Sequence, residues 1–208
     1  LAASGASMLS TKKSVKKIYA VEICKPIVEK LMPKIVNSKV IGCVGDFNHL
    51  ELPNNHLNFV FDFFSLHHSY NPEVTLKEIY RVLKPGGFLL ALDKARPDNF
   101  NDTDLEKLLD QEYDENYKKH FGIALDKKLN RRDNGEREYR LCDWKNFYTQ
   151  SGFKNFRYFY LSPCNGNYFF VRWPKFLLSL LPINLQIYLS PFVPKFNQQF
   201  DLACVNRI

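Results

Sequence analysis

The feature that most constrains the fold is the alternation of short apolar runs with amphipathic stretches over the first 95 residues. Apolar runs predict strands at 18–23, 40–44, 57–64 and 88–92. Apolar residues at helical spacing predict helices at 26–35 and 72–83, with Lys84-Pro85-Gly86-Gly87 as a turn after the second. Short strands separated by helices are typical of βαβ units. We therefore predict an α/β fold around a mostly parallel sheet.

The second half of the chain changes character at residue 96. Residues 96–140 are charged and polar, with helical patches between 105 and 117, and we predict a surface insertion that serves as a substrate cap. The sheet pattern resumes with a helix at 143–150 and strands at 153–161 and 200–205. The predicted organisation is a core at 1–95, the cap at 96–140, further core at 141–163 and 200–208, and an apolar insertion at 164–199.

Composition excludes several classes of protein. Hydrophobic residues make up 45% of the 208 residues, which excludes a disordered chain. The net charge of +7 is compatible with nucleic acid or an anionic membrane, although solvated lysines are the simpler interpretation. The five cysteines form no Cys-x-x-Cys pair, so we expect reduced core thiols and no metal site. The first residues lack the pattern of a secretion signal, and a cytoplasmic location is expected.

Three features near the predicted strand ends indicate a nucleoside-type ligand. Small residues at 1–7 precede a predicted helix at 8–17, and small side chains let the backbone approach a ligand at a helix N-terminus. Glu22 ends the first strand of this chain and can accept hydrogen bonds from a ribose diol, while Asp46 follows the next strand and can accept from an exocyclic amine. Phe47 can pack on an adenine face. Each feature alone is typical of a turn or a solvated acid, but their order favours a site at the carboxyl edge of the sheet.

Two longer segments carry a resemblance to a known family. LPNNHLNFVFDFFSLHH at 52–68 and EIYRVLKPGGFLLALD at 78–93 closely resemble class I S-adenosylmethionine-dependent methyltransferases of the type 11 group, whose "RVLKPGG" signature is nearly intact here. The resemblance covers residues 1–93 and resumes weakly at 143–153. The sequence departs from the family in its first loop, Leu1-Ala2-Ala3-Ser4-Gly5, where the family usually has three glycines, and in Leu57-Asn58, where it has "FD".

The resemblance implies a Rossmann-like sheet of seven strands, the last antiparallel, with a first strand upstream of residue 1. It also implies S-adenosyl-L-methionine as cofactor. Carried over by position, Ala2, Ala3 and Gly5 contact the methionine part, Glu22 and Ile23 the ribose, Asp46 and Phe47 the adenine, and Asp62 and Phe63 the methionine amino group.

His67 and His68 follow the strand at 57–64, and a histidine there can accept a proton at neutral pH. The other interpretation is that one of them caps the next helix. The place used for nucleic-acid amino methylation in this fold reads Asp62-Phe63-Phe64-Ser65 and lacks the expected motif, so we expect a small-molecule or lipid-linked acceptor rather than nucleic acid.

The apolar residues 173–196 fit a lid, a peripheral membrane contact or a homodimer interface, in that order, and are too interrupted by proline to span a bilayer. The leading hypothesis is a methyltransferase. A catalytically silent methyltransferase-like binding subunit is the alternative, motivated by the loss of loop glycines, and another nucleotide-binding enzyme such as a dehydrogenase is a third.

Overall fold

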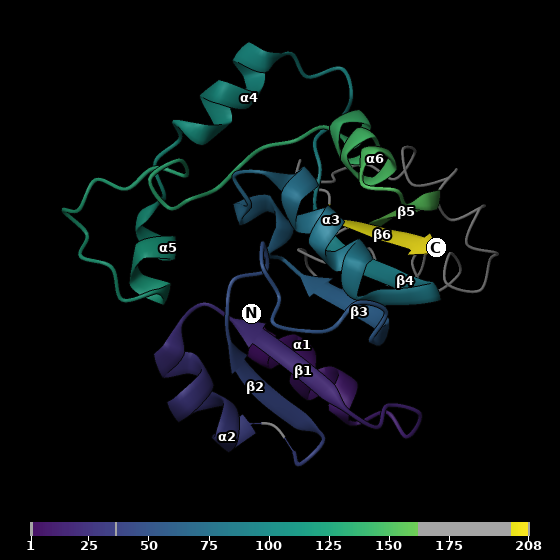
Figure 1. The fold of residues 1–208 in the computed structure, drawn as a ribbon. Coiled ribbons are helices and arrows are strands. Elements are labelled where there is room, and N and C mark those ends of the chain that lie inside the picture. Colours follow the sequence, from purple (N-terminus) through teal and green to yellow (C-terminus); the bar gives the residue numbers. More distant parts are fainter. Residues whose placement is uncertain (1, 36, 162–200, 208) are drawn as a thin grey trace, which may run out of the picture.

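The computed structural model describes residues 2–35, 37–161 and 201–207 (Figure 1). The elements run in the order α1 (Ala2–Ser10), β1 (Ile18–Glu22), the π-helix η1 (Ile27–Leu31), α2 (Met32–Ile35), β2 (Val40–Val44), β3 (Leu57–Phe63), the 3₁₀-helix η2 (Leu66–His68), α3 (Pro72–Val82), β4 (Leu83–Lys94), α4 (Asp102–Leu109), α5 (Glu115–His120), α6 (Leu141–Gln150), β5 (Lys154–Leu161) and β6 (Asp201–Arg207). The predicted segment 164–199 lies outside the described residues. Among the described helices, none is both long and apolar enough to cross a membrane.

The strands form two sheets instead of the expected sheet of seven strands. β1 and β2 pair in parallel, and β3, β4, β6 and β5 form a second sheet in that order. β3 and β4 run parallel, while β6 runs antiparallel to both of its neighbours. Among the described residues, no strand lies between β1 and β3 to join the two sheets. The sheets therefore share no ladder of hydrogen bonds.

The prediction for the first residues is wrong. Residues 2–10 form helix α1, so the small-residue run is not a loop before a helix at 8–17. Alanine has the highest helix propensity, and two alanines open this stretch. Gly5 permits a close approach to β3, because a Cβ there would lie 3.4 Å from the ring of Phe61 and 3.5 Å from Cβ of Phe63. Gly5 therefore serves the packing of α1 on β3.

The predicted turn at residues 84–87 is also wrong, because this stretch lies inside β4. Gly86 has a φ of 79°, and the pairing of β3 with β4 shifts register between Leu57 and Phe59. A Cβ at Gly87 would lie 2.8 Å from the carbonyl oxygen of Lys84. The two glycines thus let the strand form an irregularity while it continues to pair.

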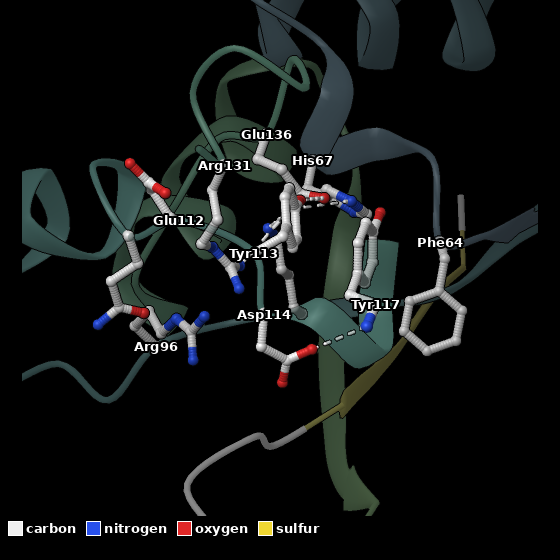
Figure 2. Close-up of a pocket in the computed structure, with 11 residues that line it drawn as sticks. Phe64, His67, Arg96, Glu112, Tyr113, Asp114, Tyr117, Arg131 and Glu136 are labelled. Atoms are coloured by element: carbon white, nitrogen blue, oxygen red, sulfur yellow. Dashed lines mark hydrogen bonds and ion pairs between the residues drawn. The ribbon is translucent and has the colours of Figure 1, made fainter. Parts of the chain in front are cut away.

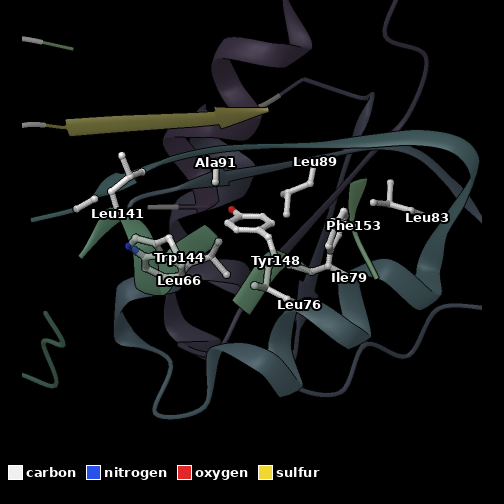
Figure 3. Close-up of a cluster of buried hydrophobic side chains, with 11 residues drawn as sticks. Leu66, Leu76, Ile79, Leu83, Leu89, Ala91, Leu141, Trp144, Tyr148 and Phe153 are labelled. Carbon is white, nitrogen blue, oxygen red and sulfur yellow. The ribbon is translucent and has the colours of Figure 1, made fainter. Parts of the chain in front are cut away.

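The main core lies between β4 and the helices α3 and α6 (Figure 3). Its buried side chains include Leu76, Ile79, Leu89, Trp144 and Tyr148. A smaller cluster of Ala6, Ala20 and Met32 joins α1 and α2 to β1. The larger cluster fixes β4, whose carboxyl end carries the candidate site described below.

The two ends of the segment 96–140 lie next to each other and are joined by backbone hydrogen bonds. The backbone N–H of Arg96 donates to the carbonyl oxygen of Tyr139 at 2.8 Å, and that of Leu141 donates to the carbonyl of Arg96 at 3.0 Å. Figure 1 shows α4 and α5, which belong to this segment, set off from the sheets. The segment returns to the carboxyl end of β4 through Glu136 and Glu138, which form ion pairs with Lys94.

Candidate active site

The clearest arrangement of polar groups begins with His67 in η2, directly after β3. Its backbone N–H donates to Oδ2 of Asp93 at 2.9 Å, and its Nδ1 lies 2.5 Å from Oδ1 of the same carboxylate. Both side chains are buried. Because the carboxylate is an acceptor, the proton sits on Nδ1 and Nε2 is left with a lone pair. His67 is thus oriented as a base.

The Nε2 atom of His67 faces a group of charged side chains. It lies 3.7 Å from Oε2 of Glu136, which also pairs with Lys94 and with Arg131. Burial alone would raise the pKa of Glu136, but the charge and hydrogen bond of Lys94 lower it overall, so this carboxylate is ionised at neutral pH. A fixed negative charge therefore stands next to the imidazole.

Glu138 is the centre of the same group. Its carboxylate accepts from Nε of Arg96 at 2.6 Å and from Nζ of Lys94 at 3.1 Å, and it also pairs with Arg131. Burial opposes ionisation, but the Arg96 hydrogen bond with the charges of Lys94 and Arg131 lowers the pKa of Glu138 to about 2. The carboxylate stays charged, and it holds three cationic side chains in place.

Five of these groups, His67, Lys94, Arg96, Arg131 and Glu136, line a cavity of about 500 Å³ (Figure 2). Its lining consists of Phe64, His67, Lys94, Arg96, Gln111, Glu112, Tyr113, Asp114, Tyr117, Arg131 and Glu136. Tyr113 and Tyr117 stack with ring centroids 3.9 Å apart, and the Tyr113 hydroxyl donates to Glu136 at 3.1 Å. The cavity combines aromatic surface with charged groups, and His67 forms part of its wall. It can hold a small organic molecule next to a base.

Asp62, near the end of β3, is buried beside this cavity wall. Its carboxylate accepts from the Ser65 hydroxyl and from the backbone of Ser65 and Leu66, so it helps to hold the turn that leads to His67. Its Oδ2 atom is buried and has no hydrogen-bond partner. Burial, reinforced by the charge of Asp93, raises the pKa of Asp62 well above its usual range. A buried acid with an unpartnered oxygen fits a cationic ligand group.

Two further residues of the predicted donor site, Glu22 and Asp46, lie at the ends of the neighbouring strands β1 and β2. The backbone N–H of Gly45 donates to the carbonyl of Glu22 at 3.1 Å, so Glu22 and Asp46 lie at the same edge of the β1–β2 sheet. The Glu22 carboxylate accepts from the backbone N–H of Cys24 at 3.2 Å, and Asp46 is exposed and accepts from the backbone and side chain of Asn48.

The other predicted site residues differ in their exposure and in the elements that hold them. Ile23 is 74% exposed, whereas Phe47 and Phe63 are half-buried. Gly5 packs on β3, as described above, and Ala2 and Ala3 lie in the first turn of α1 rather than in a loop. His68 is exposed, and its Nδ1 lies 3.2 Å from the carbonyl oxygen of Gly135. Of the five cysteines, Cys24, Cys43 and Cys142 are described as free thiols, and Cys24 is exposed rather than in the core.

Sequence reasoning missed the partners of His67. Asp93 ends the apolar run of β4, and an acid at a strand end beside the strand that leads to His67 was an available signal. Glu136 and Arg131 carry no such signal, because they belong to an irregular segment whose position depends on the closure of residues 96–140.

The comparisons with known proteins agree with this architecture. Residues 2–91 match the family described as "Methyltransferase domain". The chain is 44% identical over 53 residues to the ubiquinone/menaquinone biosynthesis C-methyltransferase UbiE of Neisseria meningitidis, a stretch that covers 26% of this chain and 22% of that protein. The UbiE of Ectopseudomonas mendocina is 37% identical over 71 residues, or 34% of this chain and 28% of its own length. The matched part thus spans about a quarter of these curated relatives.

Solved structures share the fold at low sequence identity. The phosphoethanolamine N-methyltransferase 2 of Haemonchus contortus, in complex with phosphomonomethylethanolamine and S-adenosylhomocysteine, has a TM-score of 0.60 and 12% identity over 98% of this chain and 46% of its own. The [4+2]-cyclase SpnF has a TM-score of 0.63 and 14% identity over 99% of this chain and 70% of its own. The chain therefore shares the fold of S-adenosylmethionine-dependent methyltransferases, and its residues 2–91 are similar to the methyltransferase-domain family.

Proposed function

We propose that this protein transfers a methyl group from S-adenosyl-L-methionine to a small-molecule or lipid-linked acceptor. The methyltransferase domain at residues 2–91 implies this donor, whose sulfonium supplies an activated methyl group. The observation that carries the proposal is the pairing of His67 with Asp93 in the wall of a 500 Å³ cavity, directly after β3. The UbiE relatives are C-methyltransferases, which is compatible with this acceptor class.

The chain offers a suitable group for each part of the donor. Asp62 presents a buried oxygen without a partner, which suits an ammonium group, and binding such a group would stabilise its charged form. Glu22 and Asp46 present carboxylates at adjoining strand ends, where a ribose diol and an amine can donate to them. Ile23, Phe47 and Phe63 provide apolar surface next to these acids.

The role proposed for His67 is that of a general base. Its Nε2 lone pair accepts a proton from an acceptor O–H, N–H or activated C–H group, and the Asp93 carboxylate stabilises the imidazolium that forms. Lys94 and Arg131 hold Glu136 beside Nε2, where its negative charge adds to this stabilisation. His68 is exposed as a residue, but partial desolvation of its ring and the charge of the neighbouring His67 lower its pKa, and no carboxylate orients it as Asp93 orients His67.

Calorimetric titration with S-adenosylmethionine tests the donor site. The wild-type protein is expected to bind, and Glu22→Ala is expected to weaken binding roughly tenfold or more, since each hydrogen bond to a charged group contributes ~1.5–3 kcal/mol. Glu29→Ala is the matched control, because Glu29 is an exposed acid in η1 and pairs with Lys25. Equal affinity of the Glu22 variant and the control would contradict the assignment.

A silent binding subunit is the second candidate, and one observation favours it. The residues expected to form the donor loop, Ala2, Ala3 and Gly5, lie in the first turn of helix α1, so no loop of small residues is formed there to wrap a donor. Failure of the wild-type protein to bind either S-adenosylmethionine or S-adenosylhomocysteine in the same titration would support this function and exclude methyl transfer.

Turnover measurements test the base. We expect His67→Gln to lower methyl transfer about a hundredfold or more on a panel of small amines, phenols and quinols, detected as S-adenosylhomocysteine release, while donor affinity is retained. His120→Gln, in the polar helix α5, is the control. Unchanged turnover of the His67 variant would remove this residue from the mechanism.

A further inference from the structure

His67 and Glu136 in the cavity wall, which the proposed function uses as base and stabilising charge, belong with the neighbouring His68 to a second arrangement. His67, His68 and Glu136 each place one potential ligand atom within 4.8 Å of the others. The two histidines are consecutive in η2, and their ring centroids are 4.2 Å apart. Glu136 follows Gly135, whose φ of 77° lets the chain turn back toward the histidines. Residues far apart in the sequence thus present two imidazoles and a carboxylate to one point.

Hydrogen bonds fix the tautomer of both histidines. The Asp93 carboxylate lies next to Nδ1 of His67, and the carbonyl oxygen of Gly135 lies 3.2 Å from Nδ1 of His68. Both partners are acceptors, so each Nδ1 carries the proton and each Nε2 keeps its lone pair. Histidines that bind metals are held in this way by a carboxylate or a backbone carbonyl at the other nitrogen.

The charges around the cavity also favour a cation. Its lining and the groups directly behind it contain three cationic side chains, Lys94, Arg96 and Arg131, against five carboxylates, Asp93, Glu112, Asp114, Glu136 and Glu138. The excess of two negative charges matches one divalent cation.

Lys94 competes for the same carboxylate but has a second partner. Its Nζ pairs with Glu136 and also lies 3.1 Å from Glu138. It can therefore give up Glu136 to another cation and still keep an ion pair with a buried carboxylate. Figure 2 shows Glu136 beside His67 at one end of the cavity.

We propose that Nε2 of His67, Nε2 of His68 and a carboxylate oxygen of Glu136 bind a first-row divalent transition cation such as Zn²⁺. Nε2 of His67 and Oε2 of Glu136 are already 3.7 Å apart. Ligand atoms of a tetrahedral zinc site lie roughly 3.4 Å apart, given metal–ligand distances of about 2.0–2.1 Å. A small movement closes this pair, and the exposed His68 has room to complete the set.

Titration of the tag-free, chelator-treated protein with Co²⁺ and Zn²⁺ tests the site without any acceptor or methyl donor. We expect one Co²⁺ per chain with the visible d–d bands of a tetrahedral site, displaced by Zn²⁺. His68→Ala and Glu136→Gln are expected to weaken binding at least about tenfold, as even outer-shell changes do at metal sites. His49→Ala and His120→Ala remove histidines outside the cluster and should bind as the wild type does.

Two results would overturn the proposal. One is a wild-type protein that gives no tetrahedral Co²⁺ spectrum, and the other is a His68→Ala variant that binds Co²⁺ as tightly as the wild type. Because His68 is exposed, its variant is expected to fold, and its melting temperature checks this. The titration is independent of the donor calorimetry above, so metal binding and donor binding can fail separately. A metal on Nε2 of His67 takes up the lone pair that the general base needs, so the metal-bound form is expected to lack that base.

Discussion

Asp62 is a carboxylic acid in a place that disfavours its charge. Burial and the nearby charge of Asp93 raise its pKa in the folded protein, whereas an unfolded aspartate titrates near about 3.9. The folded state therefore holds the proton more tightly than the unfolded state. The free energy of unfolding that depends on this group is greatest below the unfolded pKa and falls as the pH rises toward the folded pKa.

Asp62→Asn should consequently stabilise the protein at pH 7.5 and lose this advantage toward pH 4. The amide keeps an oxygen that can accept from Ser65, but it has no charge to bury. Urea denaturation of both proteins at a series of pH values measures the difference. A variant less stable than the wild type at pH 7.5 would show that the carboxylate is paired in the folded state. The same variant is expected to bind S-adenosylmethionine more weakly, because it lacks the charge for an ammonium group.

At the scale of elements, β2 packs closely on η1 and α2 through a glycine. A Cβ at Gly42 would lie 2.9 Å from Cγ1 of Val28 and 3.1 Å from Sδ of Met32. Met32 is almost fully buried in the small cluster with Ala20, so it has little space to move. The distance between this strand and its helices is set by the absence of a side chain at one position.

Gly42→Ala should therefore lower the free energy of unfolding by about 1–3 kcal/mol, as overpacking typically does. Gly45→Ala, directly after the same strand, is the matched control, because a Cβ there would make an ordinary contact of 3.5 Å with Val21. Chemical denaturation of both variants measures the contrast. Equal stability of the two would mean that Val28 and Met32 adjust without cost.

The elements that the sequence predicts well are those governed by a single local pattern. The apolar runs predict β1, β2 and β3 to within a residue, because a buried parallel strand needs a continuous apolar run. The start of α1 and the irregular β4 are mispredicted, because alanine and glycine are compatible with both a loop and the observed structure. Of the pair of His67 with Asp93, the sequence predicts only His67. Its partner depends on the register of β3 against β4, which the sequence does not reveal.

At the scale of the whole molecule, the two sheets differ in how they are supported. β4 is hydrogen-bonded to β3 on one side and to β6 on the other, and it packs on the main core. β1 and β2 have only each other among the described strands and pack on the cluster of Ala6, Ala20 and Met32. Stability should therefore be distributed unevenly along the chain.

Hydrogen exchange measured by mass spectrometry should detect this difference. We expect amides of β4, such as those of Leu89 and Ala91, to exchange at least about tenfold more slowly than those of Val21 and Cys43, because opening β4 breaks two ladders and exposes the larger core. Uniform rates across both sheets would show that they open as one cooperative unit.

The hydrogen bonds that join Arg96 to Tyr139 and Leu141 place both ends of the cap segment side by side. A segment whose two ends are neighbours can change in length while the strands keep their pairing, provided that it still supplies the carboxylates that pair with Lys94 and Arg96. Such an attachment lets evolution, or an engineer, vary this wall of the cavity while β3 and β4 are inherited unchanged.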